Sequence, residues 1–256
     1  MDNPEPSFVP PDQRERVRLV DSILLYNKPR LRTHITQKAQ AKYKQERKTL
    51  QVDAVSSLVK GRNTFVQAGT GFRKSRISEM FLELYQNKKK EVVLVLHPLD
   101  ALGDNQVEEK EVAGFSVINL TKMQFNRKTA LQIRDGVFNF VYLSPEVFLN
   151  SALFKEVYYD EEFQDRLALI VIDEAHMIYS WGLVDSGKAK KSSAHKRTED
   201  RSIFRPSYGD MGGQLSATEG VPILLLSATC RPVSALEPAK LAKRLLESSF
   251  SAMFLL

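Results

Sequence analysis

The sequence predicts an α/β domain with a mostly parallel sheet that is covered by helices on both faces. Short apolar runs recur along the chain, and amphipathic stretches separate them. Several of the runs are apolar at successive positions, as expected of strands buried on both faces. In such a sheet, ligands bind beyond the carboxyl ends of the strands, so the residues that follow each run are the candidates for chemistry.

The N-terminal part of the chain differs from the rest. Residues 1–15 are polar and contain four prolines, which is typical of a segment without a packed core. Residues 16–60 predict strongly charged helices, and Gly61 stops the last of them. We therefore expect a polar and helical N-terminal extension over residues 1–40 and the main domain over residues 41–247.

Apolar runs further along predict six strands, at residues 63–68, 91–97, 115–120, 138–143, 167–173 and 221–228. Amphipathic stretches at 75–87 and 145–159 predict helices between them. Residues 184–203 break this alternation, because they contain six Lys or Arg and three acidic residues but few apolar ones. We interpret them as an inserted basic loop, solvated and inert rather than a source of extra phosphate contacts.

The composition narrows the class of protein. Hydrophobic residues make up 43% of the 256 residues and charged residues 27%, which is typical of a globular domain. A single cysteine excludes an internal disulfide framework, and no run approaches the roughly 20 apolar residues that cross a bilayer. We expect a soluble intracellular protein without a membrane partner. The net charge of +6 permits a polyanionic partner without requiring one.

A glycine-bearing turn and a helix follow the first strand. The letters AGTGFRKS have the parts of a phosphate-binding loop, in which glycines let backbone N–H groups approach the phosphates of ATP. Lys74 would reach the β- and γ-phosphates, and the Ser75 hydroxyl would hold Mg²⁺. A turn with a helix-capping hydroxyl is the alternative. The predicted nucleotide-binding residues here are Ala68, Gly69, Thr70, Gly71, Phe72, Arg73, Lys74 and Ser75.

Acidic residues follow the fifth strand, in the letters DEAH at 173–176. Asp173 at a strand tip can hold Mg²⁺, and Glu174 can orient the water that attacks the γ-phosphate. A helix start also favours two acids, but it does not account for the Ala-His that follows. The predicted catalytic residues are Lys74, Asp173, Glu174 and His176.

The content and order of these motifs resemble those of superfamily 2 helicases, and within them the RecQ-like DNA helicases, over about residues 45–235. The loop at 68–75 resembles motif I, DEAH resembles motif II, and the Ser-Ala-Thr that ends the sixth strand resembles motif III. This resemblance implies a RecA-like P-loop NTPase domain that uses ATP and Mg²⁺. It also implies that Gln51, in letters similar to RecQ motif 0, reads the adenine edge.

Other segments resemble the parts of such motors that contact DNA. Residues 97–107 resemble motif Ia, and residues 143–146 resemble motif Ib. Trp181-Gly182 and the letters FRPSY at 204–208 resemble the aromatic-rich loop of RecQ, whose rings can stack on unpaired bases; ordinary core aromatics are the alternative. The resemblance assigns DNA binding to Pro98, Gln106, Pro145, Glu146, Trp181, Phe204, Arg205 and Tyr208, and coupling to Ser227, Ala228 and Thr229.

Two departures from the family pattern matter. Arg73 replaces the glycine that usually precedes the lysine, and costs about 1–3 kcal/mol if the loop requires an unusual dihedral there. Nothing after Thr229 resembles the second RecA-like domain, which supplies arginine fingers in the family. We therefore expect the chain as given to bind Mg-ATP and DNA but to unwind nothing by itself.

The leading hypothesis is an ATP-dependent 3′–5′ DNA helicase of RecQ type, acting on single-stranded DNA or its junction with a duplex. A nuclear location is expected from the DNA substrate. One alternative is a degenerate helicase-derived module that binds ATP or DNA without turnover, and another is an RNA helicase of the same superfamily. The sequence does not decide between DNA repair, recombination and telomere maintenance, or give the oligomeric state.

Overall fold

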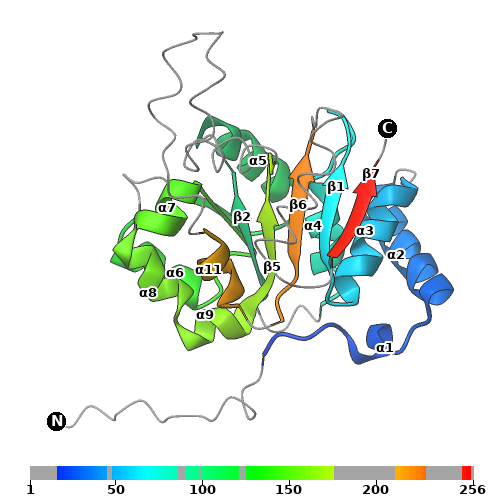
Figure 1. Cartoon of the computed structure of the whole chain (residues 1–256), viewed down its shortest axis with the longest axis horizontal. Helices are drawn as coiled ribbons and strands as arrows, with labels where there is room; N and C mark the ends of the chain where they lie inside the picture. The colour runs from blue at the N-terminus through cyan, green and yellow to red at the C-terminus, as the bar shows by residue number, and fades with distance from the viewer. Residues whose placement is uncertain are drawn as a thin grey trace, which may run out of the picture.

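A seven-stranded sheet with helices on both faces forms the body of the computed structural model (Figure 1). The structure describes residues 16–44, 48–85, 90–97, 100–120, 125–175, 211–218, 220–228 and 250–254. The strands are β1 (Asn63–Gln67), β2 (Val92–Leu96), β3 (Val117–Leu120), β4 (Phe140–Leu143), β5 (Leu167–Ile172), β6 (Ile223–Ser227) and β7 (Phe250–Phe254). The helices are α1 (Asp21–Leu24), α2 (Lys28–Tyr43), α3 (Thr49–Val59), α4 (Arg76–Leu82), α5 (Asp100–Val112), α6 (Arg127–Arg134), α7 (Pro145–Asn150), α8 (Ala152–Tyr158), α9 (Glu161–Arg166) and α11 (Met211–Ser216).

The strands lie in the order β3-β4-β2-β5-β6-β1-β7, and each neighbouring pair is parallel. The α/β class and the six strands expected from the apolar runs are therefore confirmed. The seventh strand was not expected from the sequence. It pairs with β1 at the edge of the sheet, with Phe65 opposite Ala252.

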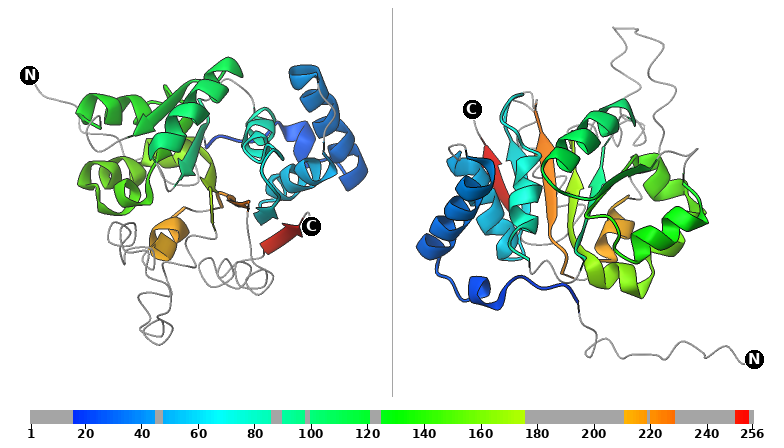
Figure 2. Two further views of the ribbon diagram at one scale, coloured as in Figure 1. Left: turned by 90° about the horizontal axis from the view of Figure 1, so that it is seen from above. Right: turned by 180° about the vertical axis from the view of Figure 1, so that it is seen from behind.

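Both faces of the sheet carry a buried apolar core, which explains why the strands are apolar at successive positions. In β5, Ile170 and Ile172 belong to one core, whereas Leu169 and Val171 belong to the other. This alternation follows from the period of two residues in a strand. Helices α1–α5 cover one face, and α6–α9 with α11 cover the other, as Figure 2 shows.

Serine residues begin the helices that follow β4. The amphipathic stretch at 145–159 forms two short helices rather than one, because Ser151 has extended backbone with ψ 112°. Its side chain accepts a hydrogen bond from Phe154 N, so Ser151 caps α8 while it ends α7. Ser144 caps α7 in the same way, through Val147 N.

Helix α2 belongs to the same packed body as the sheet. Asn27 caps it by accepting from Arg30 N, and Leu31, Ile35 and Ala39 are buried in the core that α3 and α4 share. The domain boundary expected at residue 40 thus falls inside α2. The expected basic insert, at 184–203, lies outside the described residues.

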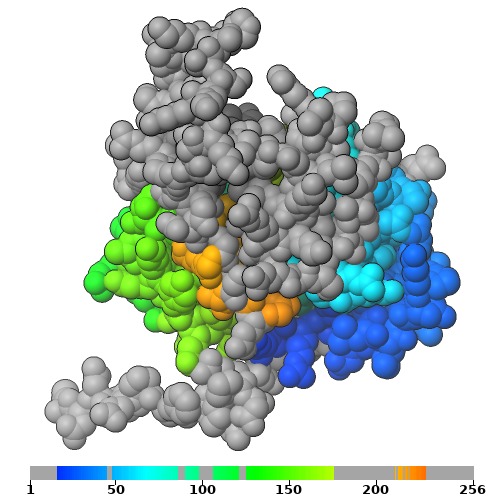
Figure 3. Space-filling model, viewed as in Figure 1, coloured from blue at the N-terminus to red at the C-terminus, as the bar shows by residue number. Residues whose placement is uncertain are grey.

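The N-terminal helices and the α6–α9 group form opposite ends of the molecule, in blue and green in the space-filling view (Figure 3). Within the part of the chain that the structure describes, no helix has the length and apolar character that a membrane span requires.

Candidate nucleotide site

The carboxyl ends of β1, β6, β5 and β2 meet at one edge of the sheet. Ala68 N donates to Ser227 O (3.1 Å), which ties the end of β1 to the end of β6. Ala175 N donates to Leu226 O (2.8 Å), and Asp173 N donates to Leu96 O (2.8 Å). The loop at 68–75 and the DEAH segment therefore flank the end of β6, although they are about a hundred residues apart in the sequence.

The loop after β1 has a conformation that two residues with positive φ create. Gly71 has φ +78°, which glycine adopts without strain, and a Cβ there would meet nothing within 4 Å. Arg73 has φ +58°, so a non-glycine residue occupies the left-handed region where the family usually has glycine. The unusual dihedral on which the expected cost of Arg73 depended is thus present.

Gln51 at the start of α3 lies against this loop. Its side chain is 3% exposed, and Nε2 donates to Phe72 O (3.1 Å) and to Arg73 O (3.2 Å). Phe72 is itself buried, with the Lys48 ammonium 4.6 Å from the centre of its ring. Gln51 therefore supports the strained part of the loop, and its assignment to the adenine edge stays a prediction.

Lys74 curls back over the loop that precedes it. Its Nζ donates to Ala68 O (2.8 Å) and lies 3.5 Å from Gly69 O, so its positive charge lies inside the turn. Burial raises the pKa of the Asp173 carboxyl, and the charge of Lys74 is near enough to oppose that rise slightly. A lysine bound to the backbone of a glycine-bearing loop, at the same edge of the sheet as an acid at a strand tip, is a suitable arrangement for phosphate with a divalent cation.

Asp173 is half-buried, and its two oxygens have separate donors. Glu174 N donates to Oδ1 (2.9 Å), and Gln106 Nε2 donates to Oδ2 (3.3 Å). Burial nevertheless raises the pKa of Asp173 above its ordinary value, against the opposing effects of these hydrogen bonds and Lys74. A bound cation would reverse this desolvation cost, and carboxylate is a ligand that Mg²⁺ prefers. The Asp173 carboxylate therefore suits a magnesium ion as one ligand, although the described residues contain no cluster of three acidic, histidine or cysteine side chains that could bind a metal.

Gln106 contacts Asp173 in the structure, and its assignment to DNA by the resemblance stays a prediction. Pro145 and Glu146 form the first turn of α7, where proline and an acid are favourable for helix formation. This turn follows β4, so it lies at the same edge of the sheet as the loop after β1. Their contact with DNA stays a prediction.

The remaining predicted residues divide into four that the structure describes and seven that it does not. Glu174 is half-buried with φ +47°, next to Asp173, while Ser227 is buried and Ala228 follows it at the end of β6. Thr70 is exposed at the tip of the loop. The other predicted residues lie outside the described part of the chain, namely Pro98, His176, Trp181, Phe204, Arg205, Tyr208 and Thr229.

A buried cluster of charged side chains contacts the end of the loop, and it was not predicted from the sequence. Lys110 of α5 forms an ion pair with Glu79 of α4, and both side chains are at most 2% exposed. Lys110 Nζ also donates to Ser75 O (3.1 Å), and Tyr43 OH donates to Glu79 Oε2 (2.5 Å). Burial lowers the pKa of Lys110, and the Glu79 carboxylate opposes that shift.

Helix α5 thus contacts both predicted metal-binding residues. Gln106 reaches the side chain of Asp173, and Lys110, one helical turn later, reaches the backbone of Ser75. A usable signal for this cluster was Glu79, an acid within the apolar letters ISEMFL of a helix that faces the core. Its partner could not be found from spacing, because 31 residues separate the two.

Comparison with known proteins agrees with this geometry. A family model described as "DEAD/DEAH box helicase" matches residues 48–236. The yeast (Saccharomyces cerevisiae) protein "ATP-dependent helicase SGS1" is 26% identical over 182 residues, covering 70% of this chain and 11% of the relative. "ATP-dependent DNA helicase RecQ" of Haemophilus influenzae is 25% identical over 182 residues, covering 70% of this chain and 25% of its own length. The chain therefore spans a quarter or less of these two relatives.

Solved structures give the same fold. The DUF1998 helicase MrfA, in a crystal structure bound to DNA and AMPPNP, superposes with a TM-score of 0.63 at 16% identity. The match covers 94% of this chain and 30% of that one. This likeness shows the fold, which is that of a RecA-like domain. Because the family model spans well over half of the sequence, the chain belongs to the DEAD/DEAH box helicase family.

Proposed function

We propose that this chain is the ATP-binding part of a 3′–5′ DNA helicase of RecQ type, which binds Mg-ATP at the edge formed by β1, β6 and β5. The single observation that carries the proposal is that the loop holding Lys74 and the strand end holding Asp173 lie beside the end of β6, at one edge of the sheet. A P-loop lysine and a strand-tip acid in this relation are what a nucleotide triphosphate and its metal require.

The residues at this edge divide the chemistry between them. Lys74 leaves the carbonyls of Ala68 and Gly69 and binds the β- and γ-phosphates, which are stronger partners because they are ionised. Ser75 and Asp173 would hold Mg²⁺, which would supply positive charge next to the phosphates. Glu174 orients the attacking water and accepts its proton. Gln51 selects adenine and transmits occupancy of the base site to the carbonyls of Phe72 and Arg73.

The names of the relatives support DNA as the substrate, since RecQ of Haemophilus influenzae is described as a DNA helicase. MrfA was crystallised with DNA, which supports the same class of partner. Turnover at useful rates requires arginine fingers, which a second RecA-like domain would supply. We further propose a nuclear location, because the proposed substrate is DNA.

The proposal is tested by titrating the full chain with a fluorescent ATP analogue, with and without Mg²⁺, and with fluorescent single-stranded DNA and RNA of the same sequence. We expect Mg-dependent nucleotide binding and tighter binding to DNA than to RNA. Lys74→Ala should weaken nucleotide binding at least about tenfold, because it removes a charge-assisted hydrogen bond. Equal nucleotide affinity of wild type and Lys74→Ala would contradict the proposal, and preference for RNA would favour an RNA helicase.

Replacing Arg73 by glycine should strengthen nucleotide binding. Arg73 has φ +58°, a conformation that glycine adopts at about 1 kcal/mol less cost, so Arg73→Gly should populate this binding-competent loop more fully and gain up to about fivefold in affinity. Isothermal titration of wild type and Arg73→Gly with Mg-ATP measures this difference. Arg73→Ala is the matched control, because it removes the same charge but keeps the Cβ. A gain in both variants would assign the effect to charge, and no gain in Arg73→Gly would refute the strain argument.

A further inference from the structure

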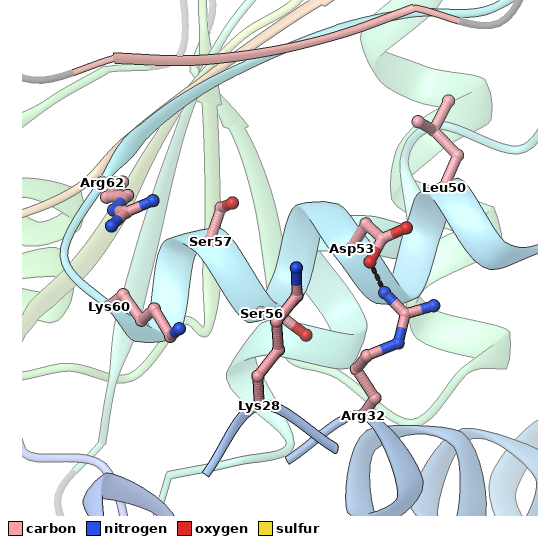
Figure 4. A pocket seen from close by; sticks show the side chains of 8 residues that line it. All are labelled: Lys28, Arg32, Leu50, Asp53, Ser56, Ser57, Lys60 and Arg62. Carbon is pink, nitrogen blue, oxygen red and sulfur yellow. Dashed lines mark ion pairs between the residues drawn. The ribbon is translucent and has the colours of Figure 1, made fainter. Parts of the chain in front are cut away.

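A basic cavity lies between α2 and α3, outside the site described above (Figure 4). Its volume is about 430 Å³, which is within the range of ligand sites. Lys28 and Arg32 extend into it from α2, while Lys60 and Arg62 reach it from the end of α3 and the turn that follows, as the close-up view shows. Two helices and a turn therefore bring four cations to one hollow.

The charge of this cavity is strongly one-sided. Asp53 is the acid that lines it, and it is ion-paired with Arg32. Among the described residues, no carboxylate forms an ion pair with the side chains of Lys28, Lys60 or Arg62. An anion that binds between these cations is attracted by all of them at once.

Helix stabilisation does not account for the cluster. Lys60 directly follows the last residue of α3, where the helix dipole favours a cation. Lys28 is the first residue of α2, where the dipole favours an anion instead. The helix dipole thus favours Lys60 and disfavours Lys28, so it does not explain why both residues lie at the cavity.

The lining indicates which anion fits. Pockets for small molecules are mostly apolar and aromatic, because those groups recognise the body of the ligand. Here the lining residues are charged or carry a hydroxyl group, apart from Leu50. Among the described residues, no aromatic ring lines the cavity. Such a surface recognises charge without reading a base or a ring. This is the chemistry of contact with a nucleic-acid backbone.

We propose that the cavity between α2 and α3 is a second nucleic-acid contact, which binds backbone phosphates through Lys28, Lys60 and Arg62. This inference rests on the proposed function, since it extends DNA binding to a second surface. Gln51 lies in the first turn of α3, and Lys60 directly follows the last residue of that helix, about 14 Å further along at 1.5 Å per residue. Nucleic acid in the cavity would therefore contact one end of the helix whose other end supports the nucleotide loop.

The test compares two charge-matched double variants of the full chain. Lys60→Gln/Arg62→Gln removes two exposed cations of the cavity, and Lys128→Gln/Lys155→Gln removes two exposed cations near α6 and α8. Fluorescence anisotropy measures binding of a single-stranded oligonucleotide over a range of salt concentrations. We expect the cavity variant to bind about tenfold more weakly at about 0.1 M salt, with a salt slope smaller by about 1.4, since each lost phosphate contact removes about 0.7.

The control variant should keep the wild-type slope. Equal slopes for the two double variants would overturn the inference. Titration with inorganic phosphate covers the other source of the same chemistry: phosphate binding that requires Lys60 and Arg62, with oligonucleotide affinity unchanged, would also overturn it. Lys28→Gln tests the α2 side separately and should lower the slope by about 0.7.

Nucleotide titration of the same proteins keeps the two proposals distinguishable. One outcome is that the wild type binds both Mg-ATP and the oligonucleotide while the two double variants bind the oligonucleotide equally well. That result would reject the contact at the cavity and leave the proposed function standing. If the wild type binds neither ligand, the proposed function fails and this inference fails with it. Unchanged Mg-ATP affinity in the cavity variant would show that its loss of oligonucleotide binding is not a loss of fold.

Discussion

Lys110→Met is expected to lower the free energy of unfolding by about 3–5 kcal/mol, because it leaves the Glu79 carboxylate buried without its cation. Both side chains are at most 2% exposed, so water cannot replace the lost partner. The substitution also removes the donor to Ser75 O, and so loosens the residue that is proposed to hold Mg²⁺. Urea denaturation monitored by circular dichroism measures the first effect, and Mg-ATP titration measures the second.

A second variant separates the ion pair from simple packing. Lys110→Met/Glu79→Gln removes both charges and keeps an acceptor for the Tyr43 hydroxyl, so it should recover most of the lost stability. It should not recover nucleotide affinity, since Ser75 O still lacks its donor. Glu111→Gln changes an exposed charge on the same helix and should unfold like the wild type. A Lys110→Met protein as stable as wild type would contradict the argument.

Asp173→Asn is expected to raise thermal stability without nucleotide while it removes the dependence of nucleotide binding on Mg²⁺. Burial raises the pKa of Asp173, so the ionised carboxylate is less favourable in the folded chain than in the unfolded one. Asparagine keeps the size of the side chain and carries no charge. A gain of about 1 kcal/mol would raise the melting temperature by about 2–4 °C in a chain of this length.

The sign of the pH dependence follows from the same shift. A raised pKa means that Asp173 keeps its proton to higher pH in the folded state than in the unfolded state. The contribution of this carboxyl to stability is therefore greatest below the ordinary aspartate pKa of about 3.9, and it is lost as pH rises through the raised value. The advantage of Asp173→Asn should therefore grow between about pH 4 and neutral pH. Calorimetry at several pH values checks this, and an advantage that shrinks as pH rises would contradict the assignment.

Asp173→Asn is also expected to remove the dependence of nucleotide binding on Mg²⁺. Even indirect support of a metal ligand is worth about 10–100-fold in metal affinity, so loss of a ligand should cost at least about 100-fold in the Mg-dependent part of ATP affinity. Gln106→Ala is the matched comparison, because it removes a hydrogen bond to Asp173 but leaves the carboxylate. It should weaken Mg-ATP binding less than Asp173→Asn. Full Mg²⁺ dependence in Asp173→Asn would exclude that residue from the metal site.

The sequence alone determined the architecture of the sheet and the place of the site. Strands buried on both faces are apolar at successive positions, as Leu169, Ile170 and Val171 are, so six of them could be recognised without coordinates. Parallel strands also fix which ends face the ligand, so the segments of Lys74 and Asp173 had to lie at the same edge. Strand β7 was not predicted, because a short apolar run near residue 250 has no distinctive period.

Only the tertiary structure decided which side chains meet. The ion pair of Lys110 with Glu79 and the convergence of Lys28 with Lys60 depend on how separate helices pack, and no local pattern encodes such partners. The positive φ of Arg73 likewise depends on the whole loop, since most residues avoid that conformation unless surrounding contacts impose it. Periodicity therefore specified the elements, and packing between elements specified the charged contacts behind the nucleotide loop.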